Sequence, residues 1–170
     1  MKKIDVSKWK EFSIKSLFTI KKGERLTKAD MRDGDIRFIG ASAINNGITA
    51  YISNDDGVNV HPGNTITVAY NGSVGESFYQ DERFWASDDV NVLYPKFAMN
   101  KEIAFFIIPV LRAVGQNYQF IDKWKLDVME DTLIKLPSSH GKPDFKYMET
   151  YIKALEKRVS KSVDAFGVLM

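Results

Sequence analysis

The stretch Pro62–Gly75, P-G-N-T-I-T-V-A-Y-N-G-S-V-G, predicts the centre of the fold. Within residues 65–70, Thr and Ala alternate with Ile, Val and Tyr, which is the period of a half-buried β-strand. Asn71-Gly72 follows and is a strong hairpin signal, because both residue types tolerate a positive φ. Gly75 would let the backbone approach another segment closely. The plainest interpretation is a core hairpin with a tight turn.

The composition of the 170-residue chain is that of a protein with a packed core, since 44% of its residues are hydrophobic. The absence of cysteine excludes disulfides and thiolate metal sites. His61 and His140 show no H-x-x-x-H spacing, so no zinc site is expected. The apolar run Ile103–Leu111 is too short to span a membrane. The basic N-terminus has no apolar run behind it, so we expect no signal peptide and a cytoplasmic location.

Charge is unevenly distributed, although the net charge is only +2. Residues 1–37 hold eleven Lys or Arg against six Asp or Glu, whereas residues 38–80 hold no Lys or Arg. The middle segment is instead rich in Asn, Ser, Thr and Gly. A basic flank beside a polar segment without cations suits a surface that grips phosphates and reads base edges. A merely solvated face would have the same composition.

The rest of the pattern predicts an α+β fold. Short strands recur up to Ile134–Pro137, and Asn100 is placed to cap a helix from Lys101 to about Ala113. Asn45-Asn46-Gly47 is a second turn signal. The pair Asp88-Asp89 would suit a metal-dependent nuclease, but no E-x-K element accompanies it, so a structural role is favoured.

The C-terminal segment predicts a long helix with a narrow apolar seam. Its apolar residues follow a 3,4 spacing with Ser162 at the one polar position, and they are Phe145, Met148, Ile152, Leu155, Val159 and Phe166. That heptad seam is typical of a coiled coil. With no second long helix to cover it, we expect a partner. The predicted division is a recognition domain over residues 1–137 and a dimerisation helix over residues 143–167.

Several of these stretches together resemble the DNA-specificity subunits of type I and type IIB restriction-modification systems. The matching motifs occur in order: the opening from Trp9 to Gly23, I-x-A-S-x-x-N-N-G from Ile39, G-S-V-G ending at Gly75, V-x-V-L-x-P from Val90, and I-x-L-P followed by P-D-F-x-Y-M-x-x-Y-I. A full specificity subunit carries two recognition domains joined by antiparallel helices. This chain has one domain and one helix, so it resembles a half-length subunit.

The resemblance implies a non-catalytic, sequence-specific DNA-binding subunit with an α+β, mixed-sheet recognition domain and a C-terminal coiled-coil helix. Its implied partners are double-stranded DNA, a DNA adenine methyltransferase subunit, a restriction endonuclease subunit and a second copy of the chain, with no membrane. S-adenosylmethionine, ATP and Mg would then bind only in partner subunits. In keeping with this, the chain lacks the [NDS]-P-P-[YFW] motif of adenine methyltransferases.

The expected sites follow from residue chemistry, and no catalytic or metal-binding residue is expected. Cations predicted to contact phosphate are Lys21, Lys22, Arg25 and Lys123. Residues predicted to lie at base edges, or beside them in the case of Tyr70, are Asn45, Asn46, Tyr70, Asn71, Ser73, Asn117 and Tyr118. Residues predicted to meet a partner are Phe145, Met148, Ile152, Leu155 and Val159.

An alternative of another class is a β-rich carbohydrate-binding module. Its stacking platforms would be Tyr51, Tyr70, Tyr79 and Trp85. The basic flank argues against it, since a neutral sugar gains nothing from eleven cations.

Overall fold

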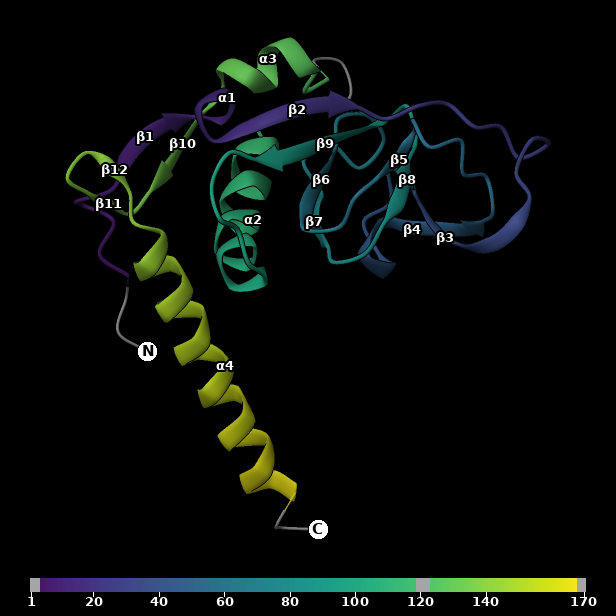
Figure 1. The fold of residues 1–170 in the computed structure, drawn as a ribbon. Helices are drawn as coiled ribbons and strands as arrows, with labels where there is room; N and C mark the ends of the chain where they lie inside the picture. Colours follow the sequence, from purple (N-terminus) through teal and green to yellow (C-terminus); the bar gives the residue numbers. More distant parts are fainter. Residues whose placement is uncertain (1–3, 119–122, 168–170) are drawn as a thin grey trace.

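The computed structural model describes residues 4–118 and 123–167, with side chains up to residue 163. Its strands form two four-stranded sheets and two short ribbons (Figure 1). The first sheet is antiparallel, in the order β2 (Phe18–Lys22), β9 (Val90–Pro95), β6 (Thr65–Ala69), β7 (Ser77–Gln80). The second is mixed, in the order β4 (Ile48–Ile52), β3 (Asp33–Ile39), β8 (Phe84–Ala86), β5 (Val60–His61).

The remaining elements complete an α+β fold, as predicted. The two ribbons pair β1 (Lys10–Ser13) with β10 (Leu133–Leu136), and β11 (Ser138–Ser139) with β12 (Lys142–Pro143). The helices are α1 (Ile14–Leu17), the 3-10 turn η1 (Asn45–Gly47), α2 (Lys101–Gly115), α3 (Leu126–Asp131) and α4 (Phe145–Gly167). No helix in the described ranges is both long and apolar enough to cross a membrane.

Strand β6 is the buried centre of the first sheet. It lies between β9 and β7, and all five of its residues are buried. The prediction of a half-buried strand is therefore wrong. Burial of the polar side is possible because the Thr67 hydroxyl donates to the Phe78 carbonyl at 3.3 Å and accepts from Gln80 Nε2 at 3.2 Å. Ile66 and Val68 instead belong to the main hydrophobic core with α2.

The β6–β7 hairpin is confirmed, but its turn is longer than Asn71-Gly72 predicted. Residues 70–76 connect the two strands, and only Gly72 and Gly75 in this loop have a positive φ. The Asn71 amide instead donates to Asp89 Oδ1 at 2.7 Å. The predicted close approach at Gly75 is confirmed, because a Cβ there would lie 2.8 Å from the Gly115 Cα. The loop is therefore fastened at both ends.

Helix α2 covers one face of the first sheet (Figure 1). Asn100 caps it as predicted, accepting a hydrogen bond from the Ile103 backbone N–H at 2.9 Å. Ile107 and Leu111 are fully buried on its inner face. Gly115 ends the helix against Gly75, so α2 fixes the position of the 70–76 loop.

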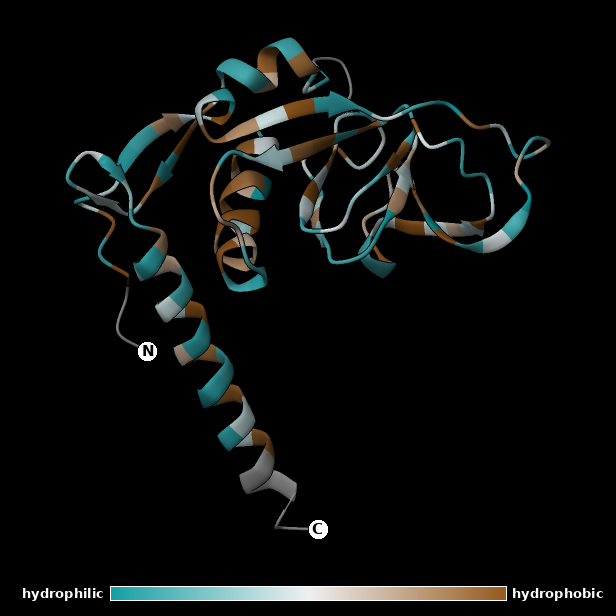
Figure 2. Ribbon diagram, in the orientation of Figure 1, coloured by the Kyte–Doolittle hydropathy of each residue, from teal (hydrophilic) through white to brown (hydrophobic). Residues whose placement is uncertain are grey.

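Helix α4 starts at the recognition domain and then extends away from it, with apolar bands along its length (Figures 1 and 2). Its start is held by Phe145, which stacks on Phe97 at 4.1 Å, and by the fully buried Met148. Farther along, Val159 and Val163 are each 63% exposed. Phe166 of the predicted seam lies outside the residues whose side chains are described.

The prediction that this chain has no second long helix to cover the seam is wrong for the first half of α4. Helix α2 packs beside it, and Lys101 of α2 reaches Glu156 of α4 at 3.7 Å. A hydrophobic periodicity identifies the apolar face but not the element that covers it. Met148 is thus a core residue, and Ile152 is half-buried against the same core.

His61 is a buried titratable group between the two sheets. It is 7% exposed, stacks on Phe84 at 5.3 Å, and places Nδ1 2.5 Å from the Tyr94 hydroxyl. Burial, assisted by the nearby charge of Lys21, lowers the pKa of His61 to about 4. The imidazole is therefore neutral in the folded protein at neutral pH.

The stability of the protein should fall as the pH is lowered from 6.5 to about 4. In that window His61 binds a proton in the unfolded chain but not in the folded protein. The contribution of neutral His61 to the free energy of unfolding is therefore fully present above pH 6.5 and is lost as the pH falls below it. The loss is at most about 3 kcal/mol. Urea denaturation at pH 7 and pH 4.5 measures it, and His61→Phe should reduce the difference. An equal pH dependence in that variant would contradict the assignment.

Candidate nucleic-acid interface

A basic cavity of about 480 Å³ opens beside the end of β2. Its lining comes from β2, β9, the start of the 70–76 loop and the segment entering α3, and consists of Lys22, Tyr70, Asn91, Lys123, Lys125, Leu126 and Asp127. Three ammonium groups and one carboxylate therefore surround a space whose walls include an aromatic ring and a leucine. Such a cavity favours an anionic occupant.

The lysines reach the cavity through strand alternation. Lys22 is paired with Asn91 across β2 and β9, and its Nζ lies 5.7 Å from the centre of the Tyr70 ring. Lys21 is the preceding residue and faces the other way, with its Nζ 4.9 Å from the Tyr94 ring. Lys21 and Lys22, both predicted to contact phosphate, therefore do not form one patch. The structure brings Lys22 together with Lys123 but not with Lys21.

Lys125 belongs to the cavity, although it is not among the cations predicted above to contact phosphate. The signal for it is the alternation around Trp124, which is fully buried while Lys125 is exposed and Lys123 is partly exposed. In an extended segment successive side chains point to opposite sides, so the lysines before and after a buried aromatic residue both point away from the core. The sequence also places Gln119, Phe120 and Asp122 in a polar, aromatic and basic segment that could contact DNA, and these residues lie outside the described ones.

Tyr70 links the lysines to the hairpin. Its hydroxyl donates to the Asp88 carbonyl at 2.5 Å. The neighbouring Tyr70 hydroxyl raises the pKa of Lys22. Arg25 lies nearby in sequence but is directed to Asp88, 3.9 Å away at an exposed position.

Tyr118 supports the cavity from inside the protein. Its ring stacks on Trp124 at 5.2 Å, and both side chains reach the Thr132 hydroxyl, at 3.2 Å and 3.0 Å respectively. Tyr118 is half-buried, and that it lies near a base edge stays a prediction. Its aromatic and polar atoms serve to position Trp124, and with it the lysines on either side.

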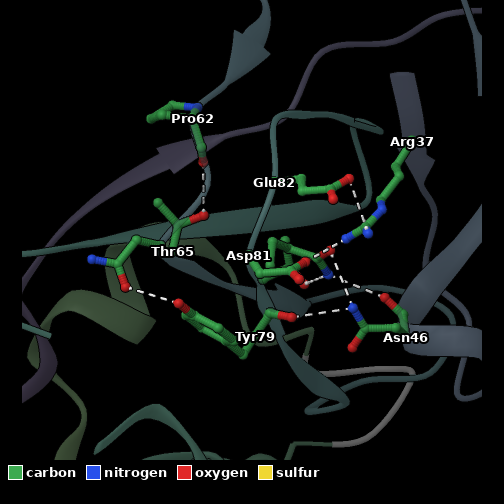
Figure 3. Close-up of polar contacts among 10 residues, drawn as sticks. Arg37, Asn46, Pro62, Thr65, Tyr79, Asp81 and Glu82 are labelled. Atoms are coloured by element: carbon green, nitrogen blue, oxygen red, sulfur yellow. Dashed lines mark hydrogen bonds and ion pairs between the residues drawn. The ribbon is translucent and has the colours of Figure 1, made fainter. Parts of the chain in front are cut away.

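Three of the predicted asparagines make internal hydrogen bonds, and Asn45 donates from its amide to the Ile48 carbonyl at 3.1 Å. Asn46 donates to the Tyr79 carbonyl at 3.1 Å and to Gln80 Oε1 at 3.3 Å (Figure 3). Its φ of 53° and those of its neighbours form the η1 turn, as predicted. Asn71 is bound to Asp89. Asn46 uses both hydrogens of its amide in these contacts. Asn71 uses one, and its amide oxygen is buried.

Three of the predicted residues remain on a continuous surface. Asn45 and Asn117 are exposed, and Ser73 is half-buried. Their loops meet at glycines: a Cβ on Gly72 would lie 3.2 Å from the Ala41 Cβ, and Gly75 contacts Gly115. We call residues 41–47, 70–76 and 115–118 the polar surface. It adjoins the basic cavity at Tyr70.

The residues that would suit a metal-dependent nuclease or a carbohydrate-binding module make structural contacts instead. Asp89 accepts from Asn71, and the described residues hold no group of three His, Cys, Asp or Glu that could bind a metal ion. Of the aromatic residues proposed to stack on sugars, Trp85 is only 5% exposed, and its indole N–H donates to the Glu24 carbonyl at 2.9 Å. The predicted four-residue aromatic platform is therefore wrong.

Comparison with known proteins agrees with this geometry. Residues 6–165 match the type I restriction modification DNA specificity domain family. The chain is 39% identical over 153 residues to the type II restriction enzyme specificity subunit S.BcgI of Heyndrickxia coagulans, covering 89% of this chain and 44% of that protein. The chain thus spans about half the length of this relative.

Solved structures show the same fold. The S subunit of a type I restriction-modification system from M. genitalium superposes with a TM-score of 0.61 at 17% identity, covering 96% of this chain and 44% of that one. The HsdS subunit from Thermoanaerobacter tengcongensis gives a TM-score of 0.63 at 13% identity, covering 96% and 41%. Because the family match covers residues 6–165, this protein belongs to the type I restriction-modification DNA specificity domain family.

Proposed function

We propose that this chain is the DNA-recognition half of a restriction-modification specificity subunit and catalyses no reaction itself. The observation that carries the proposal is the lysine-lined cavity joined to the polar surface, on a chain of the specificity domain family. The cations would hold the phosphate backbone and fix the register of the protein on the duplex. Amide and hydroxyl groups of the polar surface would then contact base edges in the major groove.

The division of labour between side chains follows from their contacts. Lys22, Lys123 and Lys125 are the proposed phosphate contacts, because they share one cavity. Asn45 and Asn117 are the proposed base contacts, since both residues are exposed, although Asn45 donates one amide hydrogen to the Ile48 carbonyl. Lys21 and Arg25 are left as peripheral phosphate contacts.

The proposed partners follow from the family. A DNA adenine methyltransferase subunit would carry S-adenosylmethionine, and an endonuclease subunit would supply cleavage with ATP and Mg. The chain would direct both to the recognition site. This division assigns residues 1–137 to recognition and residues 143–167 to assembly.

A second copy of the chain is also a proposed partner. The end of α4 exposes Val159 and Val163. Antiparallel pairing of two α4 helices would place one recognition domain at each end. The target would then be two inverted half-sites separated by a fixed gap.

Binding to DNA should be weak for the chain alone and tight with its methyltransferase subunit, because one domain covers only a few base pairs. Selection from a pool of random-sequence duplexes, with and without that subunit, measures both affinity and sequence preference. We expect an enriched sequence only with the subunit present. Nanomolar sequence-specific binding by the chain alone at physiological salt would contradict the subunit proposal, and no enrichment in either case would contradict recognition.

A further inference from the structure

Ile44 is an exposed apolar residue within the polar surface. It is 75% exposed and stands in the 41–47 segment, directly before the exposed Asn45. Residues 38–80 hold no Lys or Arg, so this segment offers no cation that could pair with a phosphate. If the polar surface meets DNA, this part of it does so with an apolar side chain beside an amide.

The turn that carries Ile44 directs the side chain outward. The Ile44 N–H donates to the Ser42 hydroxyl oxygen at 3.2 Å, and the Ile44 carbonyl accepts from the Gly47 N–H at 3.0 Å. Both backbone groups are thus satisfied inside the turn, and the side chain is what the turn presents to the outside. Asn45 and Asn46 follow with φ values of 53°, a left-handed conformation that persists only where the surrounding structure fixes it.

Contacts with the two sheets hold this turn in place. Asn46 donates to the Tyr79 carbonyl and to Gln80 at the edge of the first sheet. The Gly40 N–H, directly after β3, donates to the Gly47 carbonyl at 2.9 Å. Because the turn is already ordered, its residues would lose little conformational freedom on contact with DNA. A single exposed isoleucine is common on protein surfaces, but this one is presented by a fixed turn of the surface proposed to read bases.

The apolar group that a base presents in the major groove is the C5 methyl of thymine, and apolar side chains contact it there. We infer that Ile44 contacts a thymine methyl group and makes this chain select thymine at one position of its target. The inference rests on the proposed DNA recognition. It adds a residue that selects by an apolar contact, whereas Asn45 and Asn117 would select by hydrogen bonds.

Selection from two pools of random-sequence duplexes tests the contact, with the methyltransferase subunit present. One pool contains thymine, and in the other every thymine is replaced by uracil, which lacks only the C5 methyl. For the unmodified chain we expect a position at which thymine is enriched in the first pool and uracil is not enriched in the second. Ile44→Ala should show no preference at that position in either pool.

Binding to the selected duplex measures the size of the effect. Replacing the single thymine by uracil should lower the affinity of the unmodified chain about fourfold, which corresponds to one buried methyl group. The same replacement should leave the affinity of Ile44→Ala unchanged, because the contacting side chain is already absent. Fluorescence anisotropy of labelled duplexes gives the four dissociation constants.

Leu133→Ala is the matched control. Leu133 is 52% exposed on β10, at the opposite end of the domain from β3 and β4, which the turn of Ile44 connects (Figure 1). This variant should select the same sequence as the unmodified chain from each pool. Neither substitution should change the melting temperature, since both side chains are exposed.

The outcomes separate the contact from DNA recognition as a whole. An enriched sequence that has no uracil-sensitive position, or a thymine preference that survives in Ile44→Ala, would overturn the contact and leave recognition standing. The contact is also wrong if Ile44→Ala weakens every sequence equally, with thymine or with uracil. If the unmodified chain enriches no sequence from either pool, the proposed recognition fails and the contact fails with it.

Discussion

Replacing Lys22, Lys123 and Lys125 together by alanine should weaken the binding of every DNA sequence by about 500-fold at 0.1 M salt. All three lysines line the same cavity, and removing one phosphate-binding cation lowers the slope of log K against log salt by about 0.9. The slope should therefore flatten by about 2.7. Fluorescence anisotropy of a labelled duplex, titrated at several salt concentrations, measures both quantities.

A matched control distinguishes the cavity from diffuse positive charge. Lys10, Lys135 and Lys142 are exposed and lie on the β1–β10 and β11–β12 ribbons, on the side of the domain away from β3 and β4 (Figure 1). Their triple alanine variant has the same net charge as the cavity variant. It should retain the original salt slope. An equal loss of affinity in both variants would show that the cavity is not where the phosphates bind.

Trp124→Ala should destabilise the folded protein by about 3–5 kcal/mol. Trp124 is fully buried, stacks on Tyr118 and donates its indole N–H to the Thr132 hydroxyl. The substitution removes a large aromatic side chain from the core and leaves a cavity beside the Tyr118 ring. Urea denaturation at neutral pH measures the loss of stability, which should appear as a lower midpoint with an unchanged slope.

The same experiment contains its own comparison. Tyr51→Ala removes an aromatic side chain that is 53% exposed, and its effect should stay near ~0.5 kcal/mol. Trp124→Phe should lose less stability than Trp124→Ala, because the ring stacking on Tyr118 is retained. A loss below about 1 kcal/mol for Trp124→Ala would contradict the packing described for this segment.

Local pattern predicted the elements well because their causes are local. The alternation over residues 65–70, the Asn100 cap and the seam beginning at Phe145 each specify a strand, a helix start or a helix face within a few residues. The burial of Thr67 could not be foreseen, since it depends on Gln80 across the sheet. Likewise the cover over Met148 comes from α2, which is a separate element earlier in the sequence.

The candidate site could be predicted only in part, again because some contacts come from elements distant in the sequence. Lys22 and Lys123 could be chosen by charge, but only the strand pairing shows that Lys21 faces away from them. Asparagines at turns look alike in sequence. Asn46 is bound by Gln80 whereas Asn45 remains exposed, and this difference is set by a strand that is distant in the sequence.

The fastening of the 70–76 loop at its two ends has a consequence for evolution. Asn71 is held by Asp89 and Gly75 is held by Gly115, so substitutions at these two positions carry a folding penalty. Ser73 lies between them, and its side chain makes no hydrogen bond within residues 4–118 and 123–163. Selection for a new DNA target can therefore act on the middle of the loop while selection for a stable fold acts on its ends. Under the proposed function, Ser73 could therefore change without compensating mutations in the core.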